Sequence, residues 1–203
     1  EGEVIDWATL MRRLPADAML DRVLDRGAPL TGVASRIADV LIPFHSAEAP
    51  PCEGSSDEIY EFTMAIIREN LQEIRRIADD ALPAKTFALI EREMLSFVER
   101  NRPGMFRRIA DGYVRDGHGD LRCEHICLEN ERVQIFDCVE FNQSIRCADI
   151  ASDLAFLLMD LERLGQRGIA REIVNRYSDA GVDLPEPLLH FYMAHRALVR
   201  AKT

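Results

Sequence analysis

The chain has 203 residues, of which 47% are hydrophobic and 30% charged, and its formal net charge at pH 7 is −10. This length suits one well-buried domain, or one large lobe with a small appendage. The negative charge would repel a nucleic-acid backbone at long range, so we expect no nucleic acid as a partner. No uninterrupted apolar run approaches the roughly 20 residues of a membrane-spanning helix, so we expect no membrane partner.

The cysteines lack the regular spacing of a disulfide framework, and they are Cys52, Cys123, Cys127, Cys138 and Cys147. Because their number is odd and no apolar targeting segment opens the chain, we expect five thiols and a cytoplasmic location. Cys123, His125 and Cys127 also suggest a zinc site. Alternate residues of an extended segment, however, lie about 7 Å apart, too far for adjacent ligands with bonds of about 2.0–2.3 Å. We therefore interpret them as buried structural thiols.

Two short helices are predicted before a long loop. Asp17 is placed to cap a helix that ends at Gly27, and Thr31 is placed to cap the next one. Pro43 should kink or end that second helix. Residues 46–56, with three Pro and Gly residues, favour a loop.

Apolar residues at helical spacing predict a long amphipathic helix that starts at Asp57 and ends before Pro83. A partner helix follows, and a short helix then leads to Asp111. We interpret the apolar stripe of the partner helix as core packing, and it consists of Phe87, Ile90, Met94, Phe97 and Val98.

Residues 118–137 contain the candidate catalytic and metal-binding residues. Residues 118–125 read His-Gly-Asp-Leu-Arg-Cys-Glu-His, and residues 135–137 read Ile-Phe-Asp. An aspartate in a tight loop, here Asp120, can orient and deprotonate a hydroxyl. A second one, here Asp137, can hold the Mg²⁺ that bridges ATP phosphates. Apolar residues between them predict a β-hairpin with Asn130 in its turn, which would bring both carboxylates to one cleft.

Helical periodicity returns after Asp149, with predicted helices over residues 150–164 and 169–180 and a last helix after residue 187. Asp149 and Asp153 are typical of helix starts, and we interpret them as structural. The sequence therefore predicts an α+β fold, mostly helical, with one small β-hairpin that carries the polar residues.

These motifs, with Ala-Asp-Ile-Ala-Ser-Asp-Leu-Ala at residues 148–155, resemble those of aminoglycoside phosphotransferase and choline kinase-like proteins, which share the protein-kinase fold. The likeness is greatest to bacterial members of unknown substrate, some of which carry a further ATP-binding domain. It implies a kinase-like C-terminal lobe over residues 16–203, after the end of an N-terminal lobe and a hinge at residues 1–15. It also implies ATP, Mg²⁺ and a small-molecule acceptor.

The resemblance gives individual residues a role. Asp120 resembles the catalytic base, Asp137 the magnesium ligand and His118 the residue that braces the loop. Arg122 lies where many kinases place a cation that contacts the transferring phosphoryl group, although a surface salt bridge is an equal alternative. The hinge, where the nucleotide would bind, corresponds to Met11, Arg12, Arg13 and Leu14.

Two features depart from this family. His125 stands where asparagine is usual, and imidazole suits Mn²⁺ better than the hard ion Mg²⁺. His125 is therefore a metal ligand, a hydrogen-bonding partner of the Asp120 loop, or a packing residue. Nothing before Trp7 supplies a phosphate-covering loop, and the only lysines are Lys85 and Lys202. We expect an N-terminal lobe that is largely missing, and weak binding of ATP by these residues alone.

Two functions follow from these observations. The first is an ATP-dependent phosphotransferase that transfers the γ-phosphate to a hydroxyl of a small molecule. Acidic residues near the cleft would favour a cationic acceptor such as an amino sugar, and they are Asp111, Asp116, Glu124 and Glu140. The alternative is a non-catalytic interaction module that keeps the lobe as a scaffold.

Overall fold

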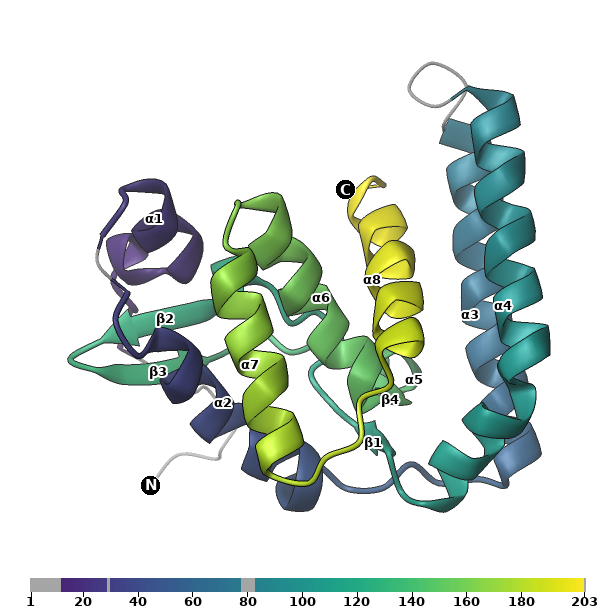
Figure 1. Ribbon diagram of the computed structural model, residues 1–203, viewed down its shortest axis with the longest axis horizontal. Coiled ribbons are helices and arrows are strands. Elements are labelled where there is room, and N and C mark those ends of the chain that lie inside the picture. The colour runs from purple at the N-terminus through teal and green to yellow at the C-terminus, as the bar shows by residue number, and fades with distance from the viewer. Residues whose placement is uncertain (1–11, 29, 78–82, 203) are drawn as a thin grey trace, which may run out of the picture.

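The computed structural model describes residues 12–28, 30–77 and 83–202 (Figure 1). The fold is α+β and mostly helical, as predicted, with two small antiparallel sheets of two strands each. Its helices are α1 (Leu20–Asp25), α2 (Val33–Pro43), α3 (Ser56–Ile77), α4 (Ala84–Ala110), α5 (Gln143–Arg146), α6 (Ile150–Arg163), α7 (Arg167–Asp179) and α8 (Glu186–Arg200). The strands are β1 (Val114–Asp116), β2 (Ile126–Glu129), β3 (Arg132–Ile135) and β4 (Cys147–Asp149). None of the described helices is long and apolar enough to cross a membrane.

The cap of α1 differs from the prediction. Asp17 lies inside a separate 3₁₀ turn, Ala16–Ala18, and the N-cap of α1 is Met19, which makes no side-chain cap. After this turn the chain contacts the hairpin, where Met19 forms an isolated bridge with Cys127. The end of the helix is as predicted, because Gly27 has a φ of 65° and stops the helix in the left-handed region.

The cap of α2 also differs, since Gly32 and not Thr31 occupies the N-cap position. Gly32 has a φ of 68°, a left-handed conformation that glycine adopts without a steric cost. Pro43 is the last residue of α2, as predicted. The chain continues beyond it in a π-helical turn, Phe44–Glu48, that buries His45.

Helices α3 and α4 form a long antiparallel pair at one side of the molecule, next to α8 (Figure 1). The short helix predicted before Asp111 is the last part of α4, which continues through Pro103 without a break. A proline removes one backbone hydrogen bond and tends to kink a helix. Here Val98 and Met105, on either side of it, are both buried and keep the same face of α4 against its neighbours.

Helix α6 lies at the centre of the core, packed against α7 and α8, while α2 covers the other side of α7 (Figure 1). Most of the α6 side chains are buried. Its N-cap is Asp149, as predicted, and the carboxylate accepts a hydrogen bond of 2.8 Å from the backbone N–H of Ala151. The start of α6 is therefore fixed next to the segment that carries the polar motifs.

The predicted β-hairpin is present as β2 and β3, with Glu129 opposite Arg132 at its closed end. Asn130 and Glu131 both have positive φ values, of 49° and 63°. Two such residues are typical of the type I′ turn that matches the twist of a hairpin. The second sheet, in which β1 pairs with β4, was not predicted, and it joins the segment before the polar motifs to the start of α6.

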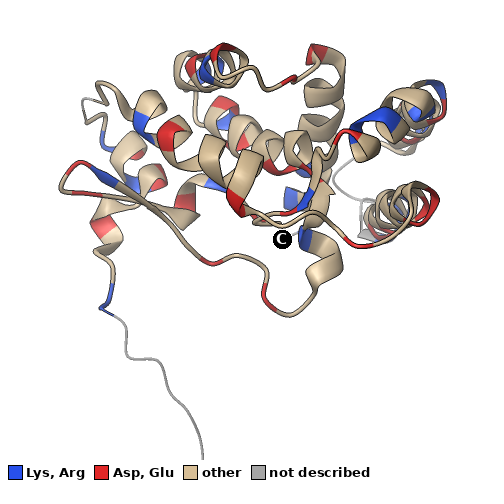
Figure 2. Ribbon diagram, turned by 90° about the horizontal axis from the view of Figure 1, so that it is seen from below, with Lys and Arg blue, Asp and Glu red and all other residues tan. Residues whose placement is uncertain are grey.

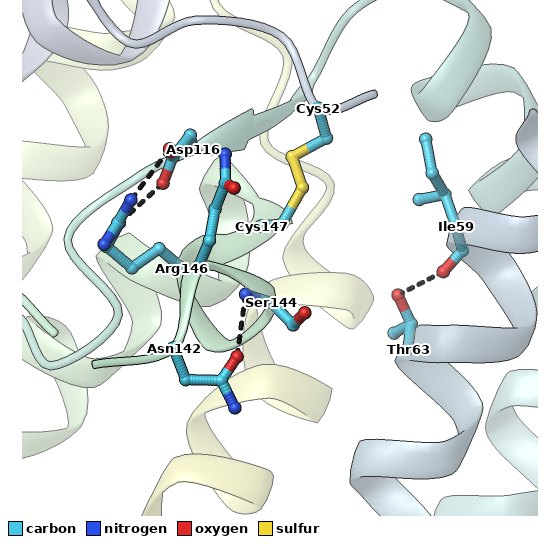
Figure 3. Close-up of a disulfide and its surroundings, with 9 residues drawn as sticks. Cys52, Ile59, Thr63, Asp116, Asn142, Ser144, Arg146 and Cys147 are labelled. Carbon is cyan, nitrogen blue, oxygen red and sulfur yellow. Dashed lines mark hydrogen bonds and ion pairs between the residues drawn. A yellow bond between two sulfur atoms is a disulfide. The ribbon is translucent and has the colours of Figure 1, made fainter. Parts of the chain in front are cut away.

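The expectation of five thiols is wrong for two cysteines, because Cys52 and Cys147 form a disulfide (Figure 3). The loop before α3 lies along β1, where the backbone N–H of Cys52 bonds to the carbonyl of Val114 at 3.5 Å. Since β1 pairs with β4, this contact places Cys52 beside Cys147, 95 residues away in the sequence. Cys123, Cys127 and Cys138 are free, and the first two are buried as expected.

Candidate active site

The loop that contains Asp120 is held by a buried carboxylate of α6. Asp153 accepts a hydrogen bond of 2.8 Å from the backbone N–H of His118 and one of 2.9 Å from that of Gly119. Its Oδ2 also lies 3.2 Å from Nε2 of His45. Burial acts to raise the pKa of Asp153, but the contact with His45 and the bond from His118 together hold that pKa at about 2. Asp153 is therefore ionised at neutral pH, and its role is structural, as predicted.

Gly119 allows the sharp turn before Asp120. Its φ is 80°, and a Cβ at this position would lie 3.1 Å from Cγ2 of Val139. A side chain here would therefore strain the backbone and crowd Val139.

His118 connects this loop to the end of the hairpin. Its Nδ1 accepts a hydrogen bond of 3.3 Å from the backbone N–H of Asp120. Nε2 then carries the proton and donates to the carbonyl of Phe136 at 2.9 Å. His118 thus links the two segments that carry Asp120 and Asp137, which is the geometry that a bracing residue requires.

His125 lies between the two aspartates. Its Nδ1 donates to the carbonyl of Asp120 at 2.8 Å, and its Nε2 is 3.3 Å from Oδ2 of Asp137. Of the roles considered for His125, hydrogen bonding to the Asp120 loop is present in the structure. Because Nδ1 carries the proton in the neutral ring, Nε2 is an acceptor. Nη2 of Arg122 lies 3.5 Å from it and can donate to it, while on the side of Asp137 Nε2 faces the carboxylate Oδ2. A proton or a metal ion between these two atoms would be stabilised.

Arg122 forms ion pairs within the same loop. Its Nη2 is 2.9 Å from Oδ2 of Asp120, and its Nη1 contacts Glu124. The salt bridge considered as an alternative for Arg122 is therefore present, although it is half-buried and involves Asp120 itself. The carboxylate of Asp120 is 28% exposed, so it stays accessible to a ligand.

Asp137 has an unusual backbone for a residue with a side chain, with a φ of 64°. Such conformations are uncommon outside glycine and often occur at functional sites. Hydrogen bonds on both sides hold it, since Phe136 N–H bonds to the carbonyl of His125 and Val139 N–H to that of His118. The Asp137 side chain is 71% exposed and is therefore free to take a ligand.

Within the described ranges no group of three or more His, Cys, Asp or Glu side chains could hold a metal ion by itself. Asp137 and His125 offer one carboxylate oxygen and one imidazole nitrogen. Mg²⁺ at nucleotide sites usually takes only one or two protein ligands, and phosphate oxygens and waters complete its shell. Asp137 therefore fits a metal brought by a nucleotide, whereas the imidazole of His125 suits Mn²⁺ better than Mg²⁺, and the two side chains do not fit a metal caged by the protein.

Of the predicted hinge residues, Arg12 lies at the end of the hairpin opposite to the two aspartates. Met11 is outside the described residues, Arg13 is exposed and Leu14 is half-buried. Arg12 pairs with Glu129 at the closed end of the hairpin. That end is roughly 10 Å from the open end, after which Asp137 follows. Nucleotide binding by the hinge residues stays a prediction.

A cleft of about 520 Å³ lies between α3 on one side and α5, β4 and α8 on the other. Figure 3 shows this region, with Ile59 and Thr63 of α3 facing the segment of Asn142, Ser144 and Cys147. The cleft adjoins the Asp120 loop, because Arg196 of α8 lines it and donates from Nη1 to the carbonyl of Gly119 at 3.2 Å. Arg196 was not predicted from the sequence, because no motif surrounds it and only the packing of α8 brings it to the loop.

The acidic residues expected near the cleft are partly neutralised. Asp116 forms two hydrogen bonds with Arg146, whose guanidinium lowers the pKa of Asp116. Glu124 pairs with Arg122 and Arg200. Acidic and basic residues also alternate over the ribbon when the molecule is seen from below (Figure 2). The support for a cationic acceptor is correspondingly weaker.

No protein-family model matches this chain. The chain is 34% identical over 198 residues to the uncharacterized protein Rv2004c of Mycobacterium tuberculosis and to the uncharacterized protein Mb2027c of Mycobacterium bovis. Each match covers 95% of this chain and 39% of the relative. The chain thus spans about two fifths of the length of the curated relatives it matches.

Proposed function

We propose that this chain is the C-terminal, kinase-like lobe of an ATP-dependent phosphotransferase, which transfers the γ-phosphate of ATP to a hydroxyl of a small molecule. The observation that carries the proposal is the cluster at the open end of the hairpin. There His125 contacts both Asp120 and Asp137, at 2.8 Å and 3.3 Å. Backbone bonds to Asp153 and His118 fix the same loop from behind.

Each side chain of the cluster has a defined part in this reaction. Asp120 orients the acceptor hydroxyl and accepts its proton as the bond to phosphorus forms. Asp137, with His125 beside it, would hold Mg²⁺ or Mn²⁺, which when bound supplies positive charge to the phosphate oxygens. Arg122 keeps the Asp120 carboxylate in place and lies close enough to stabilise negative charge in the transition state.

The acceptor occupies the cleft between α3 and α8. This position supports the proposal because Arg196 lines the cleft and also contacts Gly119, the residue before Asp120. No residue of the 118–125 loop lines the cleft itself, so the acceptor would extend beyond Arg196 to bring its hydroxyl to Asp120. Holding the two reactants in this way supplies much of the rate enhancement in phosphoryl transfer.

Asp137→Asn tests the proposal. In the intact protein we expect this change to weaken Mg²⁺-dependent ATP binding by about 10- to 100-fold, because a neutral amide replaces the charged ligand. Titration calorimetry with ATP, with and without Mg²⁺, measures the effect. Asp179→Asn, which changes an exposed aspartate of α7, is the matched control. Equal affinity in the wild type and Asp137→Asn would favour the non-catalytic interaction module.

His125→Asn tests the metal role of the histidine. We expect the ratio of activity with Mn²⁺ to activity with Mg²⁺ to fall by about tenfold, because the substitution removes the imidazole nitrogen facing Asp137 and leaves the metal with oxygen ligands. The amide nitrogen of Asn can still donate to the Asp120 carbonyl. The assay compares both metals in the wild type, in His125→Asn and in His190→Asn, whose histidine is exposed on α8. An unchanged ratio with a lower unfolding midpoint would leave His125 a bracing role only.

A further inference from the structure

Arg196 is a buried cation with part of its hydrogen-bonding capacity unused. Only 7% of the residue is exposed. Nε donates to the carbonyl of Ser152 and Nη1 to that of Gly119, both at 3.2 Å, and the guanidinium lies over the ring of Phe156. Nη2 has no hydrogen-bond acceptor among residues 12–28, 30–77 and 83–202. Because Arg196 lines the cleft, this donor is available to a ligand there.

A chain of hydrogen bonds leaves a second donor unused on the neighbouring residue, His195. Lys202 donates to Oδ1 of Asn70 at 2.6 Å, which orients the Asn70 amide. Nδ2 of Asn70 then donates to Nε2 of His195 at 3.0 Å. His195 must therefore carry its proton on Nδ1. That atom is buried and has no partner within the described part of the chain, and a buried donor without an acceptor is costly.

Two cations, Arg196 and Lys202, lie close to His195. Burial, followed by the nearby charges of Arg196 and Lys202, lowers the pKa of His195 to about 3. Two of the three carboxylates that line the cleft are already bound, since Asp149 pairs with Arg108 and Glu73 with Lys202, and the third, Glu69, is exposed on α3.

Two carboxylates interact with the charge of Arg196 but do not line the cleft, and both are also bound to other groups. Asp153 accepts hydrogen bonds from the backbone of the His118 loop, and Asp120 pairs with Arg122. The cleft therefore offers a guanidinium donor and an imidazole donor, and no described carboxylate forms a hydrogen bond with either.

We propose that the acceptor bound in this cleft carries an anionic group, a carboxylate or a phosphate, which Arg196 binds through Nη2 with the Nδ1–H of His195 beside it. The inference rests on the proposed function only in naming the ligand as the acceptor. It replaces the amino sugar favoured by the sequence with an acidic small molecule. Guanidinium groups suit both anions because their planar donors match carboxylate and phosphate oxygens.

The test measures thermal unfolding of the intact protein without ATP, in inorganic phosphate or acetate, against chloride at equal ionic strength. A ligand that binds only the folded state raises the midpoint as its concentration rises. We expect a saturable rise of the unfolding midpoint with at least one of the two anions. A rise with inorganic phosphate identifies a phosphate group as the ligand, and a rise with acetate identifies a carboxylate. Arg196→Met should raise the apparent Kd about tenfold or more, as loss of a charged hydrogen bond does. Arg171→Met, at an exposed arginine of α7, should leave it unchanged.

A rise that survives in Arg196→Met would place the anion elsewhere and overturn the inference, as would the absence of a rise with both anions. If Arg196→Met does not fold, Arg196→Lys serves instead, since it keeps the charge but loses the planar donors. Weaker binding in Arg196→Lys supports the inference and equal binding overturns it. The result is independent of Asp137→Asn, so anion binding in the cleft can hold even where ATP binding fails.

Discussion

Asp120→Asn is expected to lower the rate of phosphotransfer by the intact protein about 10²–10⁴-fold, which is the usual contribution of a positioned general base. The amide keeps the shape of the side chain but cannot accept the hydroxyl proton. The backbone of Asp120 supplies the contacts to His118 and His125, at 3.3 Å and 2.8 Å, and the substitution leaves them in place. We therefore expect little change in the unfolding midpoint.

The measurement is ATP turnover with the acceptor, or slow ATP hydrolysis where the acceptor is not yet known, together with thermal unfolding. Asp153→Asn provides the contrast, because Asp153 is buried and binds the backbone of the loop. That variant should lose stability as well as activity. Full activity in Asp120→Asn would remove its assignment as the base. A large loss of stability in Asp120→Asn would instead make it a structural residue of the loop.

Those elements that depend on local patterns could be predicted from the sequence. The helical spacing along residues 57–77 and the positive-φ turn at Asn130 are properties of neighbouring residues, and both agree with the structure. The caps of α1 and α2 could not be predicted in the same way. Asp17 and Thr31 have suitable side chains, but contacts with the hairpin and the conformation of Gly32 decide where those helices begin.

Features that join distant segments of the chain could not be predicted from patterns in the sequence. The disulfide of Cys52 depends on β1 pairing with β4. Each of these strands has only three residues, too few to show an alternating apolar pattern in the sequence. The donors of the cleft come from Arg196 and His195, on a helix whose sequence indicates only amphipathic packing. The Asp120 and Asp137 motifs were visible because each role needs a particular residue type, whereas a packed arginine can occupy any helix.

A buried ion pair connects the α3–α4 pair to the rest of the fold, and its loss should have the largest effect on stability. Arg108, near the end of α4, makes two hydrogen bonds to Asp149, at 2.6 Å and 2.8 Å. Both side chains are less than a tenth exposed. Arg108 also donates to the carbonyl of Asp183 at 2.8 Å, and its guanidinium lies 4.1 Å from the ring centre of Tyr113. One side chain thus joins α4, the start of α6 and the segment before α8.

Arg108→Met is expected to lower the free energy of unfolding by about 3–5 kcal/mol, because it leaves the Asp149 carboxylate buried and unpaired. Urea denaturation of the wild type and the variant measures this loss. Adding Asp149→Asn should recover part of it, since the amide removes the buried charge and can still cap α6. Arg107→Met, at the exposed neighbouring arginine of α4, should change the unfolding free energy by less than about 0.5 kcal/mol. Equal losses in Arg108→Met and Arg107→Met would show that the pair does not hold α4 to α6.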